Sequence, residues 1–71
     1  MEFLMKVDEI KKLDAYFKRL FGPKISVKAR LNKSDSAEVF SNSEFIGVLY
    51  QDNEDGDLSY NFSMAILRED L

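Results

Sequence analysis

The spacing of the apolar residues changes once along this chain, at Gly22 and Pro23, and this change restricts the folds open to it. Before that point apolar residues recur every three or four positions, as on one face of a helix. These residues are Val7, Ile10, Leu13, Phe17 and Leu20, with Tyr16 and Phe21 widening the face. Glycine tolerates the left-handed backbone that ends a helix, and proline cannot continue one. We therefore predict a helix over Val7–Phe21.

After Pro23 apolar and polar residues alternate, which is typical of strands with one buried face. Such runs occupy residues 24–31, 37–40, 44–51 and 58–67, and the last has its apolar face at Leu58, Tyr60, Phe62, Met64 and Ile66. Residues 32–36 and 41–43 are rich in Asn, Ser and Asp and are predicted as turns. Connections this short join antiparallel neighbours.

The predicted fold is therefore α+β, with one N-terminal helix packed on a four-stranded antiparallel meander in the order α-β-β-β-β. At this length, residues 1–71 form a single domain. Residues 1–6 precede the helical pattern and are predicted as an extension that need not be ordered. A domain this small, without disulfides or a metal, often gains stability by associating with another copy.

The third predicted strand is apolar on both faces, which a sheet covered by one helix does not require. Phe45 and Leu49 share one face, and Ile46, Val48 and Tyr50 share the other. The sequence alone leaves open which face meets the helix. Either way, large apolar side chains are left on the uncovered face of the sheet, and exposed apolar patches commonly bind a partner.

We therefore predict a protein-binding surface at Phe40, Phe45 and Leu49. The alternative is that the sheet curls, or that the apolar residues 1–5 fold over this patch. Gly47, in the middle of the same strand, indicates either a bulge or a close approach to the backbone.

Histidine and cysteine are absent, which excludes disulfides and metal sites built on imidazole or thiolate ligands. Serines are plentiful, but no histidine is present to activate one as a nucleophile. The three glycines form no phosphate-binding run. A chain this short also offers little room for a pocket that would shield carboxylates from water. We expect no enzyme activity, no catalytic residue and no cofactor.

Residues 51–62 place four carboxylates around Gly56 and are the strongest candidate for an ion site. In a calcium-binding loop with glycine sixth, oxygen ligands stand first, third and fifth, and a glutamate stands twelfth. Here the first position is Gln51 and the twelfth is Phe62, so both end ligands are missing. Asp55 and Gly56 instead match a tight turn between two strands. We predict a solvated turn and no metal site, with weak divalent-cation binding as the alternative.

Charge is distributed unevenly along the chain. Up to Lys33 there are nine basic and four acidic residues, and from Ser34 onward there are one basic and nine acidic residues. Lys28 and Arg30 would lie on one face of the first strand, where they could contact a phosphate backbone. This pattern makes nucleic-acid or ribosome association an alternative function. The simpler interpretation is that the two halves form ion pairs within the fold.

Neither a secretory signal nor a membrane-spanning segment is evident in the sequence. Residues 1–9 lack the basic start and the long apolar run of a signal peptide. No apolar stretch approaches the length needed to cross a bilayer. We therefore expect a soluble, cytoplasmic protein without a membrane partner.

Three stretches carry a family resemblance: DEIKKLDAYFKRLFG, DSAEVF and EFIGVLYQDNEDGDLSYNFSMAIL. In that order they resemble a small alphaproteobacterial family catalogued only as a domain of unknown function. The resemblance covers residues 7–71 and implies a bacterial, cytoplasmic protein that stands alone. It assigns no catalytic or binding residue to any position of this chain.

The residues themselves lead to one main hypothesis, a non-enzymatic protein-interaction module. Its expected partner is a second copy of the chain, giving a homodimer, or else another protein. Nucleic-acid or ribosome association through the basic N-terminal half is the alternative.

Overall fold

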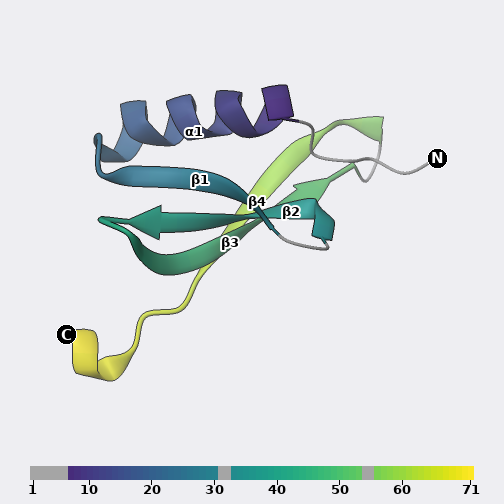
Figure 1. Cartoon of the computed structure of the whole chain (residues 1–71). Coiled ribbons are helices and arrows are strands. Elements are labelled where there is room, and N and C mark those ends of the chain that lie inside the picture. The colour runs from purple at the N-terminus through teal and green to yellow at the C-terminus, as the bar shows by residue number, and fades with distance from the viewer. Residues whose placement is uncertain (1–6, 31–32, 54–55) are drawn as a thin grey trace.

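The computed structural model of the chain describes residues 7–30, 33–53 and 56–71 (Figure 1). The elements are α1 (Val7–Phe21), β1 (Ile25–Arg30), β2 (Lys33–Ser41), β3 (Glu44–Asp52) and β4 (Ser59–Met64), followed by a short 3₁₀ turn at Arg68–Asp70. The four strands form one antiparallel sheet in the order β1-β2-β3-β4. The predicted α+β fold with one helix and a four-stranded meander is therefore confirmed.

Helix α1 begins and ends where the apolar spacing predicts. Asp8 and Glu9 lie in its first turn and Lys18 and Arg19 in its last, which suits the helix dipole at both ends. Gly22 follows with a φ of 106°, and its N–H donates to the Lys18 carbonyl at 2.9 Å. The predicted left-handed helix end is confirmed at a position where a side chain would be strained.

The hairpin between β2 and β3 turns at Asn42 and Ser43, which have φ values of 54° and 71°. Two consecutive positive φ values are typical of the two-residue turn that matches strand twist. Strand β2 begins earlier than predicted, because residues assigned to a turn by composition pair with both neighbouring strands. Ser36 in this region is buried and accepts a hydrogen bond from Arg30 at 3.1 Å, so strand pairing overrides its turn preference.

Strand β3 contains a bulge next to Gly47, one of the two alternatives that this glycine indicated. Val39 pairs with Gly47, but the next residue of β2, Phe40, pairs with Phe45, so Ile46 is the extra residue. Because the bulge shifts the alternation by one, Phe45 and Leu49 lie on opposite faces of the sheet. The prediction that they share a face is wrong.

Strand β4 is shorter than predicted and ends at Met64. Met64 pairs with Gly47, and the bulged Ile46 comes next along β3, so the regular pairing stops there. The chain then leaves the sheet. In Figure 1, residues 65–71 run away from the helix and the strands; we call them the projecting segment.

Helix α1 packs chiefly against β1, on one side of the sheet (Figure 1). The buried apolar core between the helix and the sheet consists of Phe17 from α1 and, from the strands, Ile25, Val27, Ala37, Val39 and Leu49. Phe17 is the buried residue of α1, whereas Val7 and Leu20 of the same apolar stripe are 68% and 58% exposed. The helix therefore lies over the β1 side of this face, and Tyr60 and Phe62 of β4 are only partly buried.

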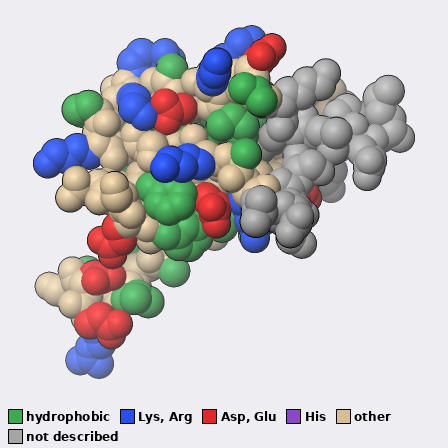
Figure 2. All heavy atoms as spheres, in the orientation of Figure 1, with side chains coloured by type: hydrophobic (Ala, Val, Ile, Leu, Met, Phe, Trp, Pro, Cys, Tyr) green, Lys and Arg blue, Asp and Glu red, His purple; other side chains and the backbone are tan. Residues whose placement is uncertain are grey.

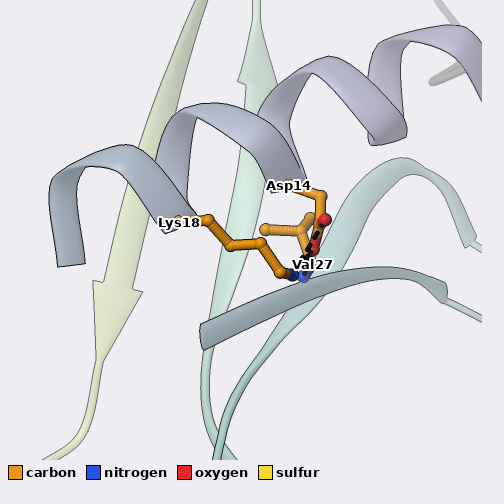
Figure 3. A network of polar contacts seen from close by, with 3 residues as sticks. All are labelled: Asp14, Lys18 and Val27. Carbon is orange, nitrogen blue, oxygen red and sulfur yellow. Dashed lines mark hydrogen bonds and ion pairs between the residues drawn. The ribbon is translucent and has the colours of Figure 1, made fainter. Parts of the chain in front are cut away.

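Asp14 fastens the helix to the outer edge of β1 (Figure 3). Its carboxylate accepts hydrogen bonds from the Val27 backbone N–H at 2.9 Å and from Lys18 Nζ at 2.7 Å. The hydrogen bond from Lys18 lowers the pKa of Asp14, and the Val27 N–H acts in the same direction. The free N–H groups of an edge strand can otherwise pair with a strand of another chain. Asp14 occupies the Val27 N–H and so blocks such pairing at this position of β1.

Replacing Asp14 by alanine should lower the free energy of unfolding by about 1–3 kcal/mol, because the Val27 N–H loses its acceptor. Asp14→Asn should cost less, since its amide oxygen can still accept from Val27. The lowered pKa means that the stability from Asp14 is present above its ordinary value of 3.8 and is lost as the pH falls through the folded-state value. Urea unfolding at pH 7 compares the two variants, and equal losses would contradict the role of the Val27 hydrogen bond. Unfolding of the wild type and Asp14→Ala at a series of pH values below 5 tests the pH dependence, and a constant difference between them would contradict it.

Candidate functional site

An apolar groove lies between α1 and strands β3 and β4, beside the contact of α1 with β1. Its volume is about 620 Å³, within the range of pockets that bind ligands. The lining residues are Glu9, Lys12, Leu13, Tyr16, Phe17, Leu20 and Phe21 of α1 and Leu49, Tyr60 and Phe62 of the sheet. Most of these side chains are apolar, so the groove suits another apolar surface.

The floor of the groove is anchored by aromatic contacts. The Phe17 ring meets the Phe62 ring edge to face, with centroids 5.4 Å apart, and lies at the same distance from the Phe21 ring. Beside this contact Tyr16, Leu20 and Phe21 remain about half exposed. The apolar groove therefore reaches solvent at the end of α1.

Polar contacts close the other end of the groove. Glu9 of α1 accepts hydrogen bonds from the Tyr60 hydroxyl and from Gln51 Nε2, the latter at 3.0 Å. Burial raises the pKa of Tyr60 to about 12, and the neighbouring Glu9 carboxylate acts in the same direction. The buried Gln51 Oε1 has no partner among the described residues, so an unsatisfied acceptor remains at this end.

The raised pKa of Tyr60 predicts a pH dependence. Its folded-state value of about 12 lies above the ordinary 10.0, so its contribution to stability is present below pH 10 and is lost between pH 10 and 12. Wild type should lose up to ~2 kcal/mol over this range through Tyr60. Tyr60→Phe, which cannot ionise, should lose correspondingly less. Denaturant unfolding of both proteins from pH 9 to 12 measures the difference, and parallel pH profiles would disprove the assignment.

The three residues predicted as a binding surface are not all brought together. Phe40 and Phe45 pack edge to face on the uncovered side of the sheet, with ring centroids 5.9 Å apart. Phe45 is 51% exposed, and Figure 2 shows a hydrophobic patch over the β2–β3 hairpin. Leu49, in contrast, is 2% exposed and belongs to the core beneath the helix. Its assignment to the same surface is corrected, because the bulge at Ile46 separates the two faces.

The acidic stretch is described in part. Glu54 and Asp55 lie outside the described residues, and Gly56 has a φ of 78°, which suits a turn. Among the residues that the structure describes, no group of three or more acidic side chains could hold a metal ion. The absence of a metal site and of a cofactor stays a prediction.

Several basic residues of the N-terminal half contact their own fold. Lys28 lies over the Phe40 ring at 5.3 Å, and Arg19 lies at the same distance over the Tyr16 ring. Lys28 also pairs across the strands with Glu38, which places a carboxylate on the predicted basic face. The salt bridge seen in the described residues joins Lys18 to Asp14 within α1, rather than the two halves of the chain. Nucleic-acid association therefore stays a prediction without a specific structural observation behind it.

Comparison with known proteins now gives the family. A family model described as protein of unknown function (DUF3126) matches residues 9–70. The chain belongs to this family. No curated protein and no solved structure gives a significant match. The DUF3126 match includes both walls of the groove and nearly all of the projecting segment, but the family description names no activity. In the described part of the chain, no helix is both long and apolar enough to cross a lipid bilayer.

Sequence reasoning missed the groove, although a signal for it was present. Tyr16 and Phe21 widen the apolar face of the helix beyond the stripe formed by residues at spacings of three and four. Such a wide face needs more sheet beneath it than two strands provide. Where α1 lies across the sheet depends on tertiary packing, which the spacing does not specify.

Proposed function

We propose that this domain is a non-enzymatic protein-interaction module that associates with a second copy of itself through the apolar groove between α1 and β4. The observation that supports the proposal is the open groove of about 620 Å³ beside a small core. Small domains of this kind often complete their apolar packing by association.

The exposed side chains set the scale of such an association. Tyr16, Leu20 and Phe21 are each about half exposed. Covering one such side chain contributes roughly 1 kcal/mol, or about 6 kcal/mol for both copies of a dimer. Association costs on the order of 4–15 kcal/mol in lost freedom of motion. A stable dimer therefore needs further apolar surface from whatever occupies the groove.

Leu20→Gln tests the proposal, with Val7→Gln as its matched control. Both substitutions replace an exposed apolar residue of α1 by the same neutral polar one, but Val7 does not line the groove. Sedimentation equilibrium should show self-association at least tenfold weaker for Leu20→Gln, from a loss of about 2 kcal/mol per dimer. Val7→Gln should associate like the wild type. Equal affinities for all three proteins would refute the groove as the interface.

The Phe40–Phe45 patch is the competing surface, and Phe45→Ser separates the two. If the groove is the interface, Phe45→Ser leaves self-association unchanged. If Phe45→Ser abolishes self-association while Leu20→Gln does not, the interface is the uncovered face of the sheet instead. Circular dichroism of each variant verifies that the fold is retained.

A further inference from the structure

The projecting segment exposes apolar side chains that its own fold does not cover. Ile66 is 66% exposed, and Leu67 and Leu71 are also more than half exposed. The backbone hydrogen bonds found for this segment stay within it, from Asp70 N–H to the Leu67 carbonyl and from Leu71 N–H to the Arg68 carbonyl. In Figure 2 the protrusion at the lower left, where the chain ends in Figure 1, carries hydrophobic side chains beside acidic and basic ones. The segment is thus a second apolar surface without a partner in the described structure.

From this, and resting on the function proposed above, we propose that the projecting segment of one copy occupies the apolar groove of a second copy. In a symmetric dimer the exchange is reciprocal, so each groove receives one segment. Exchange of an identical element between copies is a low-cost route to a dimer. It also supplies the additional apolar surface that the groove alone lacks.

The path of the chain favours a second copy over the segment's own groove. Residues 65–71 leave the end of β4 and extend away from α1 (Figure 1). To enter its own groove the segment would have to reverse direction just after Met64. Residues 65–69 contain none of the residues that favour such a reversal, which are glycine, proline, asparagine, aspartate and serine. The extended exit therefore presents the segment to another molecule.

The charges of the two surfaces are complementary. After its apolar pair the segment carries Arg68, Glu69 and Asp70, a net charge of minus one. The groove is lined by Lys12 and Glu9, and Arg19 lies over the Tyr16 ring at its open end. The charges of Lys12 and Glu9 cancel, so the positive charge beside the groove comes from Arg19, next to the lining residue Tyr16. Apolar contacts at Ile66 and Leu67 can thus be flanked by favourable charge contacts.

The test combines a segment variant with the groove variant. The double substitution Ile66→Gln and Leu67→Gln alters residues that are more than half exposed, so its own fold should remain intact. By sedimentation equilibrium we expect its self-association to weaken at least tenfold. An equimolar mixture with Leu20→Gln should form a mixed dimer, because the intact groove of one variant can bind the intact segment of the other. Fluorescence energy transfer between differently labelled variants detects that dimer.

The outcomes separate this inference from the proposed function. If wild type dimerises and the double variant dimerises equally well, the segment is not the occupant, although the groove can still be the interface. If the mixture forms no dimer while each variant alone is monomeric, the exchange is also refuted. If wild type is monomeric at all concentrations, both proposals fail. In that case, an NMR amide signal of Leu20 that differs between the double variant and the wild type would place the segment in its own groove.

Discussion

Phe17→Ala should lower the free energy of unfolding by about 3–5 kcal/mol, the loss expected for a buried phenylalanine. Phe17 is the buried residue of α1, and its ring contacts the rings of Phe21 and Phe62. A chain of 71 residues has a total stability of roughly 4–10 kcal/mol. The substitution would therefore remove a large part of it and loosen the helix from the sheet.

Urea unfolding followed by circular dichroism measures this effect. Leu20→Ala is the matched control, because Leu20 lies one turn further along the same helix but is 58% exposed. It should cost less than about 1 kcal/mol, since little apolar surface is lost. Similar losses for the two variants would mean that Phe17 does not anchor the helix as the structure has it.

Gly47→Ala should be nearly as harmful, with a loss of about 2–3 kcal/mol from overpacking. A Cβ at this position would overlap the Ser63 carbonyl oxygen and lie 2.8 Å from Phe62 Cε1. The first obstacle is backbone of the neighbouring strand, which cannot move without disturbing the pairing of Gly47 with Met64. Thermal or urea unfolding of the purified variant gives the loss.

A second substitution shows which obstacle matters. Phe62→Leu shortens the side chain near Gly47 but leaves the Ser63 carbonyl in place. The double variant Gly47→Ala, Phe62→Leu should therefore recover little of the stability lost in Gly47→Ala, when each is compared with its own parent. Full recovery would show that the Phe62 ring, rather than the backbone, excludes a side chain here.

The sequence specifies the helix and the meander well, because each depends on local spacing. Residues from Val7 to Phe21 repeat every three or four positions, and Gly22 with Pro23 ends the helix whatever surrounds it. The end of β4 was less predictable. The alternation of apolar and polar residues in β4 continues past Met64. The strand ends there because its partner strand bulges at Ile46, and the sequence of β4 contains no signal of that bulge.

The candidate site was predictable only in part. It depends on where α1 lies on the sheet, and the spacing of apolar residues along the chain does not specify that position. Phe45 and Leu49 are four residues apart, so in a regular strand their side chains would lie on the same face of the sheet. The bulge between them places the two side chains on opposite faces. Leu20 and Phe17 belong to one helical stripe, yet one is half exposed and the other buried. That difference arises because α1 packs chiefly against β1 and the groove opens beside it.

Among the described residues, six of the eleven large apolar side chains that are exposed belong to the groove or to the projecting segment. Tyr16, Leu20 and Phe21 open toward solvent on the helix, and Ile66, Leu67 and Leu71 do so on the segment. Large apolar patches that stay uncovered are unusual in small soluble domains. Pairing the two surfaces between copies removes both from water at once.

The most direct test of this account is the mass of the wild-type protein in solution, measured by sedimentation equilibrium from low micromolar to near-millimolar concentration. The chain has a mass of 8.2 kDa. We predict that the measured mass rises with concentration from that value and levels off at about twice it, as for a closed reciprocal dimer. A mass that stays at 8.2 kDa over the whole range would contradict the account.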